Sequence, residues 1–130
     1  MPTESVPKRP IEAYHALIDC LVESRRSVSA RLVEEEGVFS RVPDDVRENV
    51  LVAAMLPEQR SVLAKMLEAE RTSAIHDALA ELTWWILCRG VGLTFEGSAM
   101  PVDLSGMGLH GDFMGRLQGW NWPDDDESAG

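Results

Sequence analysis

The sequence predicts a mainly α protein: a bundle of three to four helices with a small C-terminal β-hairpin and an aromatic, glycine-rich tail. Apolar residues recur every three or four positions through most of residues 10–88, which is the spacing of one helix face. Prolines stand where helices are expected to begin, at Pro10, Pro43 and Pro57. Nine of the ten glycines lie beyond residue 89, so the helical part is expected to give way there to turns.

The first helix is expected to run from Ile11 to Glu36. Pro10 suits the first turn of a helix, because its missing N–H would have no partner there, and Gly37 is a typical stop signal. The apolar stripe of this helix comprises Ile11, Tyr14, Leu17, Ile18, Leu21, Val28 and Leu32. Residues 1–9 contain two prolines and are expected to form a flexible arm.

A second helix is expected from Pro43 to just before Pro57, with acidic residues at its positive N-terminal end. The run from Pro57 to Cys88 is also helical in its spacing. As one straight helix it would be about 48 Å long, whereas a compact domain of this size is about 35 Å across. The apolar side also turns by roughly 110° between the two halves of the run. We therefore expect a break at Arg71–Ser73, giving two helices or one bent helix.

The C-terminal part is expected to begin with a hairpin. Alternating apolar residues on either side of Gly97-Ser98 predict a short β-hairpin within residues 91–102. A short helix is expected at residues 112–117. Residues 10–123 are predicted to form a single helical domain, followed by an acidic, disordered tail at residues 124–130.

The tail before residue 124 is rich in aromatic residues. They are Phe113, Trp120 and Trp122. Each can bury on the order of 150–250 Å², so residues 112–123 are expected to dock on the side of the long helix that bears Trp84. On that surface Arg116 is expected to pair with Asp112 or with Asp77.

Charge and composition bear on the class of partner. The 22 acidic and 12 basic residues give a formal net charge of −10. This charge repels nucleic acid and anionic lipid, so neither is an expected partner, and it favours a basic protein, although many small domains are acidic for solubility alone. No apolar run approaches the ~20 residues that span a bilayer, and no signal peptide is recognised, which predicts a cytoplasmic protein. Cys20 and Cys88 match no zinc spacing and are expected to be reduced thiols.

Arg25 is unusual because it falls near the centre of the apolar stripe of the first expected helix. A guanidinium in that place must pair with a carboxylate or reach solvent. Glu70, Asp77 and Glu81 follow one line along the long helical run and offer matching carboxylates. The pair is then either structural, setting the helix register, or part of a small polar pocket for an anionic or polar ligand.

His76-Asp77 has the composition of a catalytic dyad, but adjacent helix residues point about 100° apart and are poorly placed to hydrogen-bond. The ligand pocket would be lined by Arg25, Glu70, His76, Asp77 and Arg116. Glu12-x-x-His15 has a metal-ligand spacing but lies away from the apolar stripe, so no metal site is expected. No P-loop, nucleophile elbow or dinucleotide motif is present, and neither enzyme activity nor a cofactor is predicted.

Trp84 and Trp85 are neighbours, so they cannot both face one core. Trp85 lies on the side of Leu82, whereas Trp84 points with Leu87 to another side. Either the helix is central and covered on both sides, or Trp84 lies in the interface of a homodimer, where tryptophan is a favoured anchor.

Two segments taken together resemble a known group of proteins. They are AIHDAL at residues 74–79 and DFxxRxxGxxWP at residues 112–123. They are similar to a group of small, uncharacterised bacterial proteins of the domain-of-unknown-function type, and the resemblance covers the last half of the chain. It implies a mostly helical domain and carries no activity. It makes the polar residues of the two segments worth testing.

Two hypotheses of function follow from the sequence. The first is a non-enzymatic cytoplasmic interaction module, immunity- or adaptor-like, that binds a basic protein partner through its acidic surface. The second is a small-ligand-binding protein or an unrecognised enzyme that uses the polar pocket. We prefer the first because of the net charge, the small size and the lack of a catalytic motif in the sequence.

Overall fold

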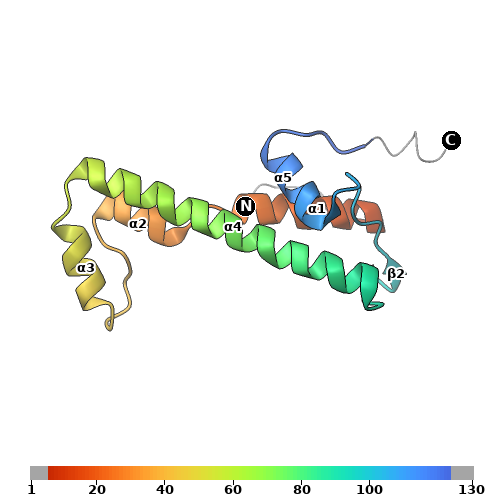
Figure 1. Cartoon of the computed structure of the whole chain (residues 1–130), viewed down its shortest axis with the longest axis horizontal. Coiled ribbons are helices and arrows are strands. Elements are labelled where there is room, and N and C mark those ends of the chain that lie inside the picture. The colour runs from red at the N-terminus through yellow and green to blue at the C-terminus, as the bar shows by residue number, and fades with distance from the viewer. Residues whose placement is uncertain (1–5, 124–130) are drawn as a thin grey trace. The chain divides into compact units, whose positions relative to one another are not determined.

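The computed structural model describes residues 6–123, and five helices and one hairpin lie in that part of the chain (Figure 1). The elements in order are α1 (Pro10–Ser24), α2 (Val28–Glu36), α3 (Val46–Ala53), α4 (Pro57–Cys88), β1 (Thr94–Phe95), β2 (Ser98–Ala99) and α5 (Gly108–Leu117). The predicted fold class, mainly α with a small C-terminal hairpin, is confirmed. The predicted acidic tail at residues 124–130 and residues 1–5 of the predicted arm lie outside the described residues.

The described residues group into two compact units. The terminal unit contains the residues up to Glu23 and those from Ile75 onward, and the central unit contains Ser24–Ala74. The helix α4 runs through both, with its first part in the central unit and its second part in the terminal unit. Because the units share this helix, the single domain predicted for residues 10–123 stays a prediction.

The first helix ends earlier than predicted. The chain leaves the helix at Arg25, and α2 follows as a separate helix. Ser27 is the N-cap of α2, and its Oγ accepts a hydrogen bond from the Ala30 N–H at 3.2 Å. A serine oxygen that accepts a hydrogen bond from a free N–H group stabilises the start of a new helix. The prediction of one helix that runs to Glu36 is therefore wrong. The predicted stop at Gly37 is confirmed, since its φ of 69° is left-handed.

The helix α4 is continuous through the break predicted at Arg71–Ser73. Thr72 Oγ1 donates back to the Glu68 carbonyl at 2.9 Å inside the helix instead of capping a new start. The predicted alternative of two separate helices is therefore wrong, and the alternative of one bent helix stays a prediction. The two halves serve different units, with Ala64 buried in the central unit and Leu79 in the terminal unit.

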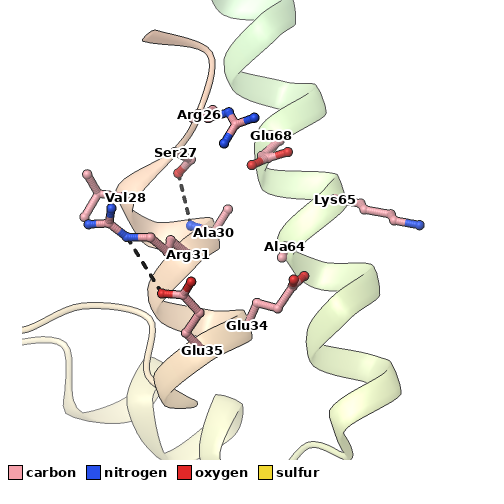
Figure 2. A pocket seen from close by; sticks show the side chains of 10 residues that line it. All are labelled: Arg26, Ser27, Val28, Ala30, Arg31, Glu34, Glu35, Ala64, Lys65 and Glu68. Atoms are coloured by element: carbon pink, nitrogen blue, oxygen red, sulfur yellow. Dashed lines mark hydrogen bonds and ion pairs between the residues drawn. The ribbon is translucent and has the colours of Figure 1, made fainter. Parts of the chain in front are cut away.

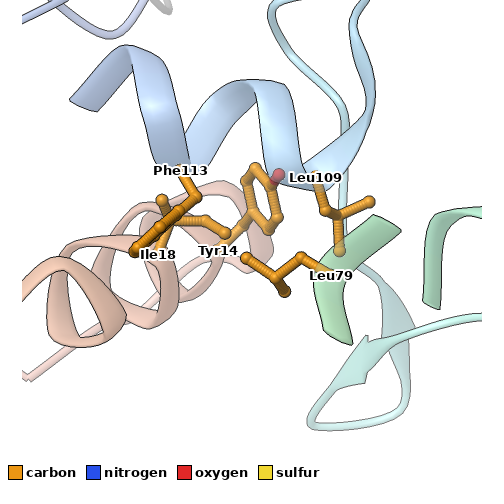
Figure 3. Packing of buried hydrophobic residues seen from close by; sticks show 5 residues of the cluster. All are labelled: Tyr14, Ile18, Leu79, Leu109 and Phe113. Carbon is orange, nitrogen blue, oxygen red and sulfur yellow. The ribbon is translucent and has the colours of Figure 1, made fainter. Parts of the chain in front are cut away.

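The core of the terminal unit joins α1, α4 and α5 (Figure 3). Its buried apolar side chains are Tyr14, Ile18, Leu79, Leu109 and Phe113. Partly buried apolar residues on either side of the hairpin, such as Leu93 and Met100, pack against this cluster. The core thus lies between the three helices, with the hairpin at its edge.

The strands β1 and β2 form an antiparallel hairpin that pairs Thr94 with Ala99. The turn is Glu96-Gly97, with φ values of 49° and 82°. It lies one residue before the predicted Gly97-Ser98 turn. Two consecutive positive φ values are typical of a type I′ turn, whose twist matches that of a hairpin.

The aromatic tail docks on α1 rather than on the Trp84 side of α4, so the predicted docking side is wrong. Trp122 stacks on His15 with ring centroids 4.3 Å apart and meets Tyr14 edge-on at 5.8 Å. Trp84 stays 45% exposed and has Trp85 as a ring neighbour. The helix α5 also begins four residues earlier than predicted.

Replacing Phe113 by alanine is expected to lower the free energy of unfolding by about 3–5 kcal/mol, because it leaves a cavity in the core of the terminal unit. Urea unfolding followed by circular dichroism measures this change. Met107→Ala is the matched control, since that side chain is 73% exposed. Equal stability of the two variants would contradict the assignment of Phe113 to the core.

Candidate functional site

The residues predicted to line a ligand pocket fall in both units. Arg25 and Glu70 belong to the central unit, and His76, Asp77 and Arg116 belong to the terminal unit. Arg25 lies in the turn after α1, and the described residues include no ion-pair partner for it. The helix ends before Arg25, and the structure shows no pair of Arg25 with Glu70 of the same unit. Asp77 and Glu81 belong to the other unit, so a pair of Arg25 with either of them stays a prediction. Glu70 is exposed on α4.

His76 and Asp77 are the predicted residues that the structure brings together. His76 Nδ1 lies 3.0 Å from Asp77 Oδ1, within hydrogen-bond distance, although the two residues were expected to be poorly placed for such a bond. Their side chains are 38% and 80% exposed, and free side-chain torsions compensate for the angle between adjacent helix positions. His110 of α5 meets His76 edge-on, with ring centroids 5.1 Å apart. Within residues 6–123 no group of three or more His, Cys, Asp or Glu side chains is arranged to hold a metal ion.

Arg116 pairs with Asp19 of α1 instead of with Asp112 or Asp77, which corrects the predicted pairing. Arg116 Nε lies 2.7 Å from Asp19 Oδ1, and its Nη1 donates to the Trp120 carbonyl at 2.6 Å. Trp122 Nε1 donates to Asp19 Oδ2 at 3.2 Å. These bonds hold the chain after α5 against α1. The role of Arg116 in the structure is thus to position the tail.

Asp112 is a fully buried carboxylate that sequence reasoning did not single out as buried. The Tyr14 hydroxyl donates to Asp112 Oδ2, as does the Leu104 N–H at 2.8 Å, and the Ser105 N–H donates to Oδ1 at 2.7 Å. Tyr14 in turn accepts a hydrogen bond from the Asp103 N–H at 3.2 Å. A buried tyrosine needs a partner for its hydroxyl, so the lone tyrosine on the apolar stripe is the signal that could have led to such a group.

Tyr14 stays a proton donor in this network. Burial raises the pKa of Tyr14 well above its ordinary value of 10.0, and the hydrogen bond to Asp112 raises this pKa further. Both oxygens of Asp112 are bonded to fixed groups of the chain. The arrangement suits a structural lock between α1, α5 and the loop before α5, rather than a base that exchanges protons with a substrate.

A polar groove of about 440 Å³ lies between α2 and the first part of α4 (Figure 2). It is lined by Arg26, Ser27, Val28, Ala30, Arg31, Glu34, Glu35, Ala64, Lys65 and Glu68. Arg31 Nε lies 4.0 Å from Glu35 Oε2, and both side chains are more than half exposed. Positive and negative groups alternate around the groove, so it offers contacts to a small polar ligand. None of the five predicted pocket residues lines it.

A second groove, of about 750 Å³, is apolar and lies between α3 and α4. It is lined by Leu51, Ala54, Met55, Glu58, Gln59, Val62, Leu63 and Met66. Six large apolar side chains within residues 46–66 are 58–65% exposed, and three of them, Leu51, Val62 and Met66, line this groove. The six are Val46, Val50, Leu51, Leu56, Val62 and Met66, and we call them the α3–α4 apolar surface.

Trp84 and Trp85 form a smaller exposed surface at the end of α4. They are 45% and 43% exposed, with rings edge-to-face at 5.6 Å. The Arg89 guanidinium lies 4.9 Å from the Trp84 ring and 5.7 Å from the Trp85 ring. A cation over an aromatic face is favourable, so Arg89 holds both rings in place.

The fold and these surfaces define a small, mainly α protein organised around a buried tyrosine–aspartate hydrogen bond. The chain belongs to DUF6547, a family of unknown function whose model matches residues 7–124. The resemblance to a domain of unknown function is thereby confirmed, and the match extends well beyond the last half of the chain. No curated protein and no solved structure matches the chain. None of the described helices combines the length and the apolar character needed to cross a bilayer.

The raised pKa of Tyr14 predicts lower stability at alkaline pH. Above pH 10 the unfolded chain releases the tyrosine proton and the folded chain keeps it, so the stabilisation is complete below pH 10 and falls above it. The free energy of unfolding is expected to drop by up to about 1.4 kcal/mol per pH unit there. Urea unfolding from about pH 9 to about pH 11 measures this slope, and Tyr14→Phe is expected to remove it.

Tyr14 is the one tyrosine in the chain, so tyrosinate absorbance reports on it directly. The absorbance is expected to rise only as the protein unfolds. A rise at the ordinary pKa of tyrosine while the protein stays folded would contradict the buried hydrogen bond.

Proposed function

We propose that this protein is a non-enzymatic cytoplasmic interaction module, immunity- or adaptor-like, that contacts other proteins through the α3–α4 apolar surface. The observation that carries the proposal is the exposure of six large apolar side chains, 58–65% each, within residues 46–66. Three of them, Leu51, Val62 and Met66, line one groove, and exposed apolar side chains that gather in one place are typical of protein-binding sites.

The composition of α3 supports this proposal. Its buried residue is Val52, whereas Val46 and Val50 lie one turn apart and are both exposed. The apolar side of α3 therefore packs only in part against its own unit. A partner protein that covers Val46 and Val50 would remove this surface from water.

The distribution of charge supports a basic protein as the partner of the residues outside the central unit. Residues 24–74 carry eight basic and nine acidic side chains, and the remaining residues carry four basic and thirteen acidic ones. The net charge of −10 is thus concentrated outside the central unit. An acidic region of this kind accelerates the approach of a basic protein more than it adds affinity.

A small-ligand-binding role is the second candidate, and the polar groove between α2 and α4 favours it. Arg26 and Arg31 supply cations there and Glu68 supplies a carboxylate, whereas the Lys65 side chain points away from α2 (Figure 2). A ligand at about 100 times its dissociation constant would add about 2.7 kcal/mol to the free energy of unfolding. A thermal-shift screen against metabolites and metal ions tests this role, and a flat response across the library would count against it.

The proposed function predicts that Val50→Asp abolishes the capture of partner proteins. A charge on the α3–α4 apolar surface opposes the burial of its neighbours, and capture by a tagged chain is expected to fall at least about tenfold. Val28→Asp is the matched control, because Val28 is 61% exposed on α2, outside this surface. Captured proteins are identified by mass spectrometry at low and high salt.

Loss of a captured basic protein at high salt would support steering by the acidic region. Equal capture by the two variants would contradict the α3–α4 apolar surface as the docking site.

A further inference from the structure

The central unit leaves more large apolar side chains exposed than it buries. Its fully buried large apolar residues are Leu32, Val33 and Val52. Its exposed ones are Val28, Val42, Val46, Val50, Leu51, Leu56, Val62 and Met66. A unit of about fifty residues buries a smaller share of its surface than a larger domain does and gains from further burial. The central unit is therefore stabilised when another molecule covers it.

The charge of the central unit indicates which molecule would cover it. With eight basic and nine acidic side chains, residues 24–74 are almost neutral. A strongly basic partner gains little attraction at such a surface. Two copies of this chain, in contrast, repel one another strongly through their acidic remainders and only weakly through their central units. Two copies of this acidic chain can therefore associate with least repulsion through the α3–α4 apolar surface.

We propose that the occupant of the α3–α4 apolar surface is a second copy of this chain, placed by a twofold axis. This inference rests on the proposed function and names the partner for that surface. In a twofold interface the same patch contacts itself, so it must be complementary to itself in charge as well as apolar. The α3–α4 surface is apolar, and charged side chains of both signs lie beside it on α4.

The charges that would complement one another across a twofold axis lie on α4. Glu58 and Lys65 are both exposed and are seven positions apart, so they lie on nearly the same side of the helix, flanking Val62. When a second α4 packs antiparallel across a twofold axis near Val62, Glu58 of each copy faces Lys65 of the partner subunit. Met66 adds a flexible side chain that adapts to an irregular apolar contact.

Sedimentation equilibrium of the full chain over the micromolar to millimolar range tests the proposal. The wild type is expected to show a concentration-dependent dimer, and Val50→Asp is expected to weaken it at least about tenfold. Val28→Asp is expected to dimerise like the wild type, because Val28 is equally apolar and exposed but lies outside the surface. Circular dichroism and thermal unfolding of each variant show whether it is folded.

A charge-exchange experiment tests the twofold arrangement separately. Glu58→Lys and Lys65→Glu are each expected to weaken their own dimer, because like charges then face one another. An equimolar mixture of the two variants is expected to restore association, since every facing pair in the mixed dimer is again of opposite sign. A mixture that stays as weak as the separate variants would overturn this arrangement.

Three results would overturn the proposed dimer. They are a monomer at all concentrations, equal association of Val50→Asp and Val28→Asp, and a dimer that is lost in Trp84→Ala but kept in Val50→Asp. The last result would instead assign the homodimer to the Trp84 surface. A monomeric chain that loses partner capture in Val50→Asp would refute the dimer and keep the proposed function. A dimer that captures no other protein would refute the proposed function and support the proposed dimer.

Discussion

The terminal unit depends on the hydrogen bond between the Tyr14 hydroxyl and the Asp112 carboxylate. A fully buried carboxylate is costly unless donors surround it. One donor comes from α1, and two come from the N–H groups of Leu104 and Ser105 in the loop before α5. All three segments must therefore be in place together. Phe113, which follows Asp112 in the chain, is brought into the core by the same requirement.

The two units use their polar and apolar side chains in opposite ways. In the terminal unit the polar groups of Asp112 and Arg116 are hydrogen-bonded inside the unit, and the apolar residues of the cluster around Phe113 are buried or partly buried. In the central unit the largest apolar surface faces outward, on α3 and the start of α4. The buried polar network and most of the exposed large apolar side chains thus belong to different units, and α4 runs through both.

Local features of the fold were predictable and distant pairings were not. The helix starts at Pro10 and Pro57, the stop at Gly37 and the hairpin all depend on neighbouring residues. The separate start of α2 was missed, although Ser27 is a good capping residue, because the apolar stripe continues across it. Of the predicted pocket residues, the structure pairs only His76 with Asp77 among those it describes. The rest of that pocket depended on an arrangement of helices that spacing does not specify.

Helix type, helix ends and net charge follow from the amino-acid sequence alone, because each depends on side chains within a few positions of one another or on simple composition. Only the folded chain decides which polar side chains meet. Tyr14 and Asp112 are 98 positions apart, and Asp19 and Arg116 are 97 apart. Periodicity places each of these residues on a helix face, but it does not say which face of another helix lies opposite.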